Sequence, residues 1–298
     1  MSHYTMERFQ KYKRYILVIF IFLAAIVVWY FVYTYEHRIS YLKVVFLDIG
    51  QGDSIYIEAP NGKQMLVDGG PSPIVLSRLA KVMPWGDHSI DVLLATHTDA
   101  DHIAGFNSVL DHYKVGRIFE NGAVNTTKTY TDLQNSITKH HVQETIARKG
   151  MRIILDSKHN VYFDILFPDR DISNFDSNDG SIVGKLTYGN ESFMLTGDAT
   201  IYTENLIMQT ESADMLHSQV LKLGHHGSKY SSSELWLENV HPDVAIVSAG
   251  VNNRYGHPNP ETLGQLADLR IPYIATLGKG SIVFKTDGIT LSESQLKN

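Results

Sequence analysis

Apolar and polar positions divide the chain into one long apolar run near the amino terminus and many short runs after it. The long run, residues 15–35, contains no charged side chain and is long enough to cross a hydrocarbon core of ~30 Å as a helix. Tyr and Trp residues lie near its ends, as in membrane-spanning helices, and basic residues precede it. Because basic flanks stay cytoplasmic, the pattern predicts a cytoplasmic segment 1–14, a single transmembrane helix 15–35, a linker 36–40 and an extracytoplasmic domain 41–298.

Two other interpretations of this run fit its residues less well. A cleaved signal peptide would have a shorter apolar region and a small-residue cleavage site, whereas this run ends in aromatic residues. A core helix of a soluble protein fits poorly with so long a stretch that carries no charge. The chain contains no Cys, which excludes a lipid-modified cysteine, disulfides and thiolate metal sites. An uncleaved membrane anchor is therefore the favoured interpretation.

After residue 40, apolar runs of strand length alternate with turns and amphipathic segments. Strands are predicted near residues 41–47, 55–58, 65–67, 90–96, 117–120, 151–156, 161–167, 182–188, 193–195, 220–223, 244–248, 273–276 and 281–285. Helices are predicted near residues 72–83, 132–149, 202–210 and 259–269. The order of strands, then helix, then strands occurs twice, which predicts two β-sheets packed face to face with helices outside, in one α/β domain.

Charge is distributed unevenly along the chain. The net charge is −6, and residues 1–40 carry five basic and two acidic residues, a balance of +3 that leaves −9 for the remainder. A domain this acidic lacks the overall basic surface that is typical of nucleic-acid-binding proteins. The composition therefore argues against indiscriminate DNA binding, although it does not exclude a local basic groove.

The strongest chemical signal is a cluster of His and Asp directly after one predicted strand. The apolar run Ile90–Thr96 is followed by His97-Thr-Asp99-Ala-Asp101-His102. A strand fixes the backbone, and a short loop after it can direct several side chains to one point. On an extended backbone the alternation places His97, Asp99 and Asp101 on one side, while His102 points elsewhere and could serve a second ion. The pattern predicts a metal site.

Further metal-capable residues follow other predicted strands. They are Asp68 in Val-Asp-Gly-Gly, Asp198 in Leu-Thr-Gly-Asp, and His225 or His226 in Gly-His-His-Gly. Loops at one edge of a sheet converge in space, so residues that are far apart in sequence can meet there. One such residue would mean little, but several loops of this kind favour a metal centre over simple turns or caps.

The sequence His-x-Asp-x-Asp-His after a buried strand resembles the metal motif of the metallo-β-lactamase superfamily, whose commoner form is His-x-His-x-Asp-His. Asp99 in place of the second His resembles one branch, the hydrolase domain of the ComEC/Rec2 competence proteins. Three phrases look like the same branch: Phe-Leu-Asp-Ile-Gly-Gln-Gly-Asp, Ser-Asn-Asp-Gly-Ser-Ile-Val and Asn-Arg-Tyr-Gly-His-Pro. The resemblance runs from about residue 41 to the carboxyl terminus and implies a four-layer αββα sandwich. It does not include the polytopic channel region of the competence proteins, so a role in DNA import is not implied.

The resemblance also implies a role for each residue of these motifs. Asp68 corresponds to a group that orients the metal ligands. His226 is expected to support a ligand or to face the substrate. The ligand set that the resemblance implies is His97 and Asp99 on one ion, Asp101 and His102 on the other, Asp198 bridging both, His225 as the later ligand, and Asp179 or a water where many members have a His.

The chemistry follows from such a site. Two divalent ions can lower the pKa of a bridging water and give a hydroxide that attacks a phosphorus or carbonyl centre. Asp99 in place of a His makes the site richer in oxygen, so Mn²⁺ is as plausible as Zn²⁺. Asp68, Asp101 and His257 are the predicted catalytic residues, with His257 either donating a proton to the leaving group or holding a phosphate, unless it is a structural His. The predicted substrate contacts are His226, Ser228, Lys222 and Arg254, although a Ser cluster such as 231–233 before a helix is more often a cap.

The predicted function is a membrane-anchored, extracytoplasmic binuclear metallohydrolase that cleaves a phosphodiester, with DNA as one candidate substrate. One alternative is a hydrolase of another ester or amide, such as a phosphocholine ester or a β-lactam. Another is a non-catalytic competence-accessory surface protein that keeps the fold for binding. The apparently intact ligand set argues against the last of these, because a decayed member would be expected to have lost a ligand.

Overall fold

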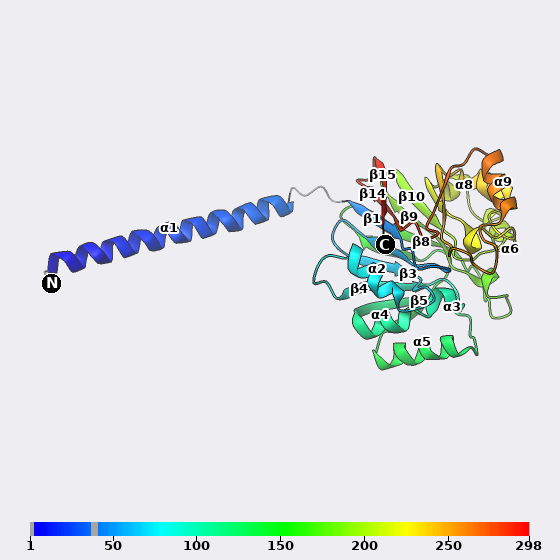
Figure 1. The fold of residues 1–298 in the computed structure, drawn as a ribbon, viewed down its shortest axis with the longest axis horizontal. Helices are drawn as coiled ribbons and strands as arrows, with labels where there is room; N and C mark the ends of the chain where they lie inside the picture. The colour runs from blue at the N-terminus through cyan, green and yellow to red at the C-terminus, as the bar shows by residue number, and fades with distance from the viewer. Residues whose placement is uncertain (1–2, 37–40, 298) are drawn as a thin grey trace. The chain divides into compact units, whose positions relative to one another are not determined.

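The computed structural model describes residues 3–36 and 41–297, which belong to two separate units. The first is a helix, α1 (His3–Glu36), in which Tyr12–Tyr33 is long and apolar enough to cross a membrane (Figure 1). This span overlaps the predicted transmembrane helix 15–35 because the same uncharged run determines both. Of the predicted linker 36–40, only Glu36 lies within the described residues.

Two β-sheets form the centre of the second unit, which begins at Tyr41. The first sheet, in spatial order, contains β15 (Leu291–Leu296), β14 (Ser281–Thr286), β1 (Leu42–Phe46), β2 (Ile55–Glu58), β3 (Gln64–Val67), β4 (Ser89–Ala95), β5 (Lys114–Glu120) and β6 (Gln143–Ile146). The second contains β13 (Tyr273–Ala275), β12 (Val244–Val247), β11 (Val220–Lys222), β10 (Glu191–Leu195), β9 (Val183–Tyr188), β8 (Val161–Phe167) and β7 (Arg152–Asp156).

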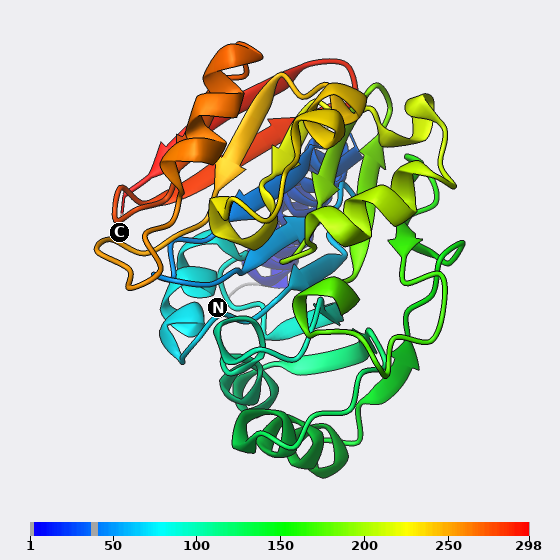
Figure 2. The ribbon, with the colours of Figure 1, turned by 90° about the vertical axis from the view of Figure 1, so that its right-hand side faces the viewer.

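Helices cover the outer face of each sheet, so the unit has four layers (Figures 1 and 2). Apolar residues of α2 (Ile74–Val82), α3 (Ala100–Ile103), α4 (Phe106–His112) and α5 (Lys128–Lys139) pack on the first sheet. Those of α6 (Ile201–Met208), α7 (Ala213–Leu216), α8 (Glu234–Val240) and α9 (Pro260–Asp268) pack on the second. The predicted αββα fold is confirmed.

The strands β1, β2 and β3 of the first sheet are buried on both faces, as β1 illustrates. Val44 and Phe46 face the second sheet, whereas Val45 faces the helices, and all three are buried. A strand that is covered on both faces reads as a continuous apolar run, with no polar residue at alternate positions. This explains why most strands of the sandwich could be located from their apolar runs.

One predicted element is wrong. The helix predicted at residues 132–149 is instead α5, which ends at Lys139, and β6 follows it. His141 has a φ of 53°, a left-handed conformation that stops the helix, and β6 then pairs in parallel with β5. Pairing with a neighbouring strand outweighs helix propensity, which is a weak determinant of structure. The edge strand β15, which pairs with β14, was also not predicted.

Parallel strands place the ends of several loops at one edge of the sandwich. In the first sheet β3, β4, β5 and β6 run parallel to one another, and in the second sheet β10, β11, β12 and β13 do so. Neighbouring parallel strands have their carboxyl ends at the same edge of the sheet. The loops after β3, β4, β10 and β11 are those that carry the metal-capable residues.

Candidate metal centre

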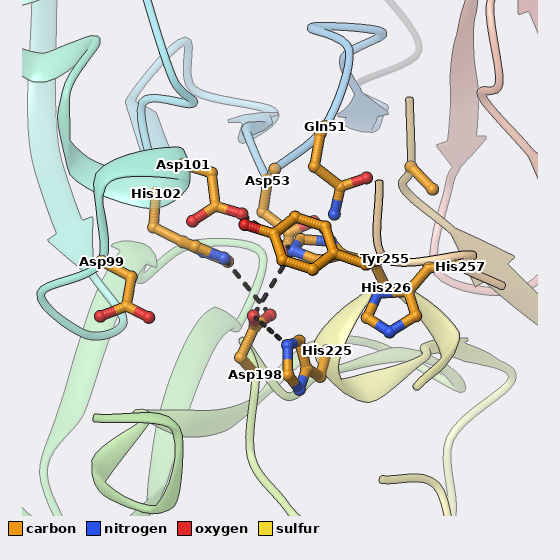
Figure 3. Close-up of polar contacts among 12 residues, drawn as sticks. Gln51, Asp53, Asp99, Asp101, His102, Asp198, His225, His226, Tyr255 and His257 are labelled. Atoms are coloured by element: carbon orange, nitrogen blue, oxygen red, sulfur yellow. Dashed lines mark ion pairs between the residues drawn. The ribbon is translucent and has the colours of Figure 1, made fainter. Parts of the chain in front are cut away.

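Three histidine rings and one carboxylate meet at this edge, and Figure 3 shows two of these rings, His102 and His226, beside Asp198. The rings of His97 and His102 lie 4.1 Å apart between centroids, and that of His226 lies 5.3 Å from His102. Asp198 lies between the loops, with Oδ1 3.3 Å from His102 Nε2 and Oδ2 3.4 Å from His226 Nε2. Asp101 Oδ2 lies 3.5 Å from the same His226 nitrogen. Residues from three different loops are therefore in direct contact.

Each of these histidines is held by its Nδ1 atom, which leaves Nε2 facing the others. His97 Nδ1 lies 3.0 Å from Thr96 Oγ1, and His226 Nδ1 lies 2.9 Å from the carbonyl oxygen of Ser248. His102 Nδ1 lies 2.7 Å from Asp68 Oδ2. A fixed Nδ1 contact orients the ring and sets its tautomer, as in the outer partners of metal-binding histidines.

Asp68 anchors the loop after β3 and does not face the centre of the cluster. Its carboxylate accepts hydrogen bonds from the backbone N–H of Thr96 and from Thr96 Oγ1, both at 2.8 Å, in addition to its contact with His102. The residue adopts a left-handed backbone conformation, with a φ of 58°. The contact with His102 supports an orienting role for Asp68, which stays a prediction.

The polar atoms that face the centre fit a metal site. His97 Nε2, His102 Nε2, His226 Nε2, Asp198 Oδ1 and Asp53 Oδ1 are buried, and none has a hydrogen-bond partner among the described residues. Buried polar atoms nearly always have a hydrogen-bond partner, so five such atoms without a partner around one point indicate that a ligand binds there. Imidazole and carboxylate are the donor set that Zn²⁺ and Mn²⁺ accept. Four groups of three side chains here bring their donor atoms within 4.8 Å of one another: His97, His102 and Asp198; Asp101, His102 and His226; Asp53, Asp68 and His102; and Asp53, Asp198 and His226.

The charges around the cluster favour positive ions. Burial alone would lower the pKa of His102, but the carboxylates of Asp198 and Asp68 raise it well above its ordinary value. Burial likewise opposes protonation of His226, yet Asp198 and Asp53 raise its pKa to about 9. Burial alone would raise the pKa of Asp198, but His226 and His102 hold it well below its usual range. The cluster thus stabilises cationic charge, whether carried by protons on His102 and His226 or by divalent ions.

The loop after β4 is not extended throughout, so the predicted alternation of side chains between its two sides does not apply. Asp99 is the extended residue before α3, which begins at Ala100, and the helical turn brings His102 back beneath His97. His102 therefore points into the cluster and not away from it. Asp99 Oδ1 accepts a hydrogen bond from Ser177 Oγ at 2.6 Å, while its Oδ2 lies 3.8 Å from His97 Nε2. Asp99 thus borders the cluster, and its role as a ligand stays a prediction.

The two adjacent histidines after β11 have different surroundings. Both have left-handed backbone angles, with φ of 46° at His225 and 56° at His226. The side chain of His226 is 1% exposed and contacts three carboxylates, whereas that of His225 is 26% exposed and lies 3.8 Å from Asp198. His226 belongs to two of the four potential metal groups and His225 to none of them. The geometry therefore favours His226 where the sequence favoured His225.

Three predicted site residues do not face the centre of the cluster or the pocket. Asp179 Oδ1 accepts a hydrogen bond from Thr200 Oγ1, and Asp179 belongs to none of the four groups. Lys222 is fully buried, so it cannot contact a substrate directly. Ser228 is also buried, and its Oγ accepts a hydrogen bond from the backbone of Tyr230. The structure places these side chains where they support the loops.

The remaining predicted residues lie at the mouth of the site. His257 is half-buried, and its ring centroid is 5.2 Å from that of His225. Burial and the neighbouring histidines lower the pKa of His257 to about 4, so the ring is neutral at neutral pH. A pocket of about 460 Å³ adjoins the cluster at Asp101 and is lined by Gln51, Pro71, Ala100, Asp101, Asn253, Arg254 and Tyr255. Arg254 is thus beside the space that a substrate could enter.

Sequence reasoning missed Asp53. Its Oδ1 lies 3.5 Å from His226 Nδ1, and its backbone N–H donates to the carbonyl oxygen of Asp101 at 3.3 Å. Gly52 permits this approach, because a Cβ at that position would lie 2.1 Å from the same carbonyl oxygen. Asp53 ends the phrase Gly-Gln-Gly-Asp, which resembles the competence branch, but the sequence pattern predicts no role for this residue.

A family model described as the metallo-beta-lactamase superfamily matches residues 47–251, and the chain belongs to this superfamily, whose metallo-hydrolase fold it has. Among curated proteins, ComE operon protein 3 of Bacillus subtilis is 31% identical over 262 residues, which cover 82% of this chain and 33% of that protein. Recombination protein 2 of Haemophilus influenzae is 28% identical over 257 residues, with 84% and 30% covered. These relatives are competence proteins of the ComEC/Rec2 type, as predicted, and the chain spans about a third of their length.

Two solved structures share the fold of this chain. The metallo hydrolase Igni18 from Ignicoccus hospitalis superposes with a TM-score of 0.55 at 16% identity, covering 83% of this chain and 99% of that one. YhfI from Bacillus subtilis superposes with a TM-score of 0.55 at 13% identity, covering 82% and 100%. At these identities the likeness shows the fold alone.

Proposed function

We propose that the protein is a membrane-anchored, extracytoplasmic hydrolase that uses two divalent ions to cleave a phosphodiester. The observation that carries this proposal is the convergence of His97, His102, His226 and Asp198 with buried donor atoms that lack hydrogen-bond partners among the described residues. Five unsatisfied atoms at one point would be costly without a ligand. A metal centre at the loop edge of a metallo-hydrolase fold is the simplest explanation.

When bound, the ions would acidify a water molecule and stabilise the charge that develops on the substrate. The protein's own residues prepare the site for this. Asp68 and Thr96 hold two histidine rings in place, and Asp101 lies at the border between the cluster and the pocket. His257 is neutral at pH 7 because its pKa is lowered. A neutral imidazole ring keeps one N–H group, which can donate a hydrogen bond to a substrate oxygen.

Two observations favour a phosphodiester among the substrates of such hydrolases. Arg254 has an exposed guanidinium group at the pocket beside Asp101, and guanidinium groups pair well with phosphate oxygens. Curated relatives carry the names Recombination protein 2 and Competence protein ComA, which favours a nucleic acid as the diester. The acidic domain suits recognition through this local contact and not through a broad basic surface.

A substrate panel tests the activity. The full chain in detergent, loaded with Mn²⁺ or Zn²⁺ separately, is assayed on plasmid, single-stranded DNA, bis-p-nitrophenyl phosphate and nitrocefin. We expect cleavage of at least one phosphodiester that is lost in Asp198→Ala and retained in Asp214→Ala, an exposed aspartate of α7. Cleavage of nitrocefin alone would favour an amide substrate, and metal binding without any hydrolysis would favour a binding role.

The orientation in the membrane has a separate test. The basic residues before the apolar span predict that the domain from Tyr41 onward is outside the cytoplasm. Protease added to intact cells should digest that domain and spare an epitope tag at the amino terminus. Digestion only after the cells are permeabilised would reverse the proposed topology.

A further inference from the structure

A buried ion pair lies beneath the candidate metal centre, between the two sheets' loops. Lys222, at the end of β11, is fully buried, and its Nζ lies 2.7 Å from Asp53 Oδ2. The same Nζ donates a hydrogen bond to the carbonyl oxygen of Leu223 at 2.8 Å. Lysine is rarely buried in full, because removing an ammonium group from water is costly unless a partner compensates it. The packing of β11 alone therefore does not explain a buried lysine at this position.

The partner of this lysine reaches the metal centre with its other oxygen. Asp53 Oδ1 is buried, has no hydrogen-bond partner among the described residues, and lies 3.5 Å from His226 Nδ1. Asp53 is also part of a potential metal group with Asp198 and His226. One oxygen of Asp53 is thus held by Lys222, and the other faces the ligands.

The backbone holds Asp53 in the same position. Its N–H donates to the carbonyl oxygen of Asp101, and Ser248 Oγ donates to the carbonyl oxygen of Gly52 at 3.1 Å. Ser248 in turn accepts from His226 through its own carbonyl oxygen. The loop that carries Asp53 is therefore fixed to both histidine-bearing loops, and a change at Asp53 is transmitted directly to the cluster.

The pair of Lys222 and Asp53 adds no net charge to the site. Five carboxylates lie in or beside the cluster. Among the described residues, Lys222 is the only Lys or Arg that forms an ion pair with one of these carboxylates. Five negative charges and one positive charge leave −4, which is the charge that two divalent ions neutralise. The carboxylates counted are Asp53, Asp68, Asp99, Asp101 and Asp198.

We propose that Lys222, which holds Asp53 by one oxygen, places a fixed positive charge beside the metal centre that offsets the charge of Asp53. The pair acts as a neutral unit, so Asp53 orients its neighbours without adding its full charge to the ligand set. This role rests on the proposed metal binding. It differs from a structural salt bridge, because it gives the two members of the pair opposite effects on metal affinity.

The test measures metal affinity in a double-mutant cycle. The full chain in detergent is titrated with Mn²⁺ and with Zn²⁺ against a fluorescent chelator, for wild type, Lys222→Met, Asp53→Asn and the double variant. Lys222→Met removes a nearby positive charge and should bind ions about tenfold more tightly or better. Asp53→Asn leaves that charge uncompensated and should bind about tenfold more weakly or worse. The double variant, again neutral as a pair, should return to within about threefold of wild type.

Melting curves of the metal-free proteins separate this role from folding. Each single variant leaves one buried charge alone and should melt below wild type, whereas the double variant should recover most of the loss. A merely structural pair would give the same melting pattern, but the two single variants would shift metal affinity in the same direction or not at all. That result would overturn the proposal.

If Lys222→Met does not fold, the decision rests on whether the double variant restores the affinity that Asp53→Asn loses. A wild type that binds no ion overturns the proposed function as well, while a wild type that binds ions with no opposite shifts overturns this inference alone.

Discussion

The loop after β4 and the turn after β11 supply the histidines of the site in different ways. Both follow a buried strand of a parallel set, and each brings at least one ring into the cluster. After β4, a short helix returns His102 to the ring of His97. After β11, two successive left-handed residues separate neighbours, so that His226 is buried and His225 lies nearer the surface. Adjacency in sequence therefore does not determine which side chain reaches a site when the backbone is neither extended nor regularly helical.

The largest effect is expected at the residue that both loops contact. Asp198→Ala removes the carboxylate that approaches His102 and His226, so metal content should fall from about two ions per chain to below about one. Elemental analysis of the purified full chain measures this content, with Asp214→Ala as the exposed control. An unchanged content in Asp198→Ala would mean that the two loops do not share an ion.

Within the first loop, Asp101→Asn should abolish most phosphodiesterase activity with little effect on folding. Asparagine is nearly isosteric with aspartate but lacks the charge that holds a cation, so we expect a loss of about 100-fold in kcat/KM. The side chain of Asp101 is 30% exposed, so the core should be unaffected. Melting curves should be compared without metal, since bound ions stabilise the native state by mass action. Full activity of Asp101→Asn on every diester that wild type cleaves would contradict this assignment.

In the second loop, the adjacent histidines form a matched pair. His226→Ala should weaken metal binding by about 100-fold, and His225→Ala by less than about tenfold, because only His226 has a buried Nε2 facing two carboxylates. Titration of both variants with Mn²⁺ and Zn²⁺ measures the difference. The reverse order would restore the sequence-based assignment of His225 as the ligand.

The smallest effect is expected behind the first loop. Thr96→Val keeps the shape of the side chain but removes the hydroxyl that donates to Asp68 and contacts His97, so metal affinity should fall by about tenfold. Thr203→Val is a matched control, because Thr203 is equally buried and donates to the carbonyl oxygen of Asp179. Both variants should lose thermal stability, and only Thr96→Val should lose affinity. Equal affinities would show that the hydroxyl has no part in holding the histidines.

Several features of the protein are determined by its sequence alone. The uncharged run 15–35 marks a helix that is long and apolar enough to cross a membrane. Continuous apolar runs mark most strands, because a strand buried on both faces must be apolar along its length. Asn259 and Pro260 mark the start of α9, where the Asn side chain accepts from the backbone N–H of Glu261. The residues after β3, β4, β10 and β11 could be identified as a converging set because parallel strands end at one edge.

Other features were decided only by the tertiary structure. Whether His225 or His226 faces the cluster depends on two left-handed backbone angles that the sequence Gly-His-His-Gly does not specify. The pairing of Lys222 with Asp53 joins the end of β11 to the loop after β1, and no local pattern encodes a contact across such a separation. Helix propensity alone did not separate α5 from β6, because the pairing of β6 with β5 is a contact between segments. Local sequence sets which residues are available at the loop edge, and long-range packing sets the direction in which each of them points.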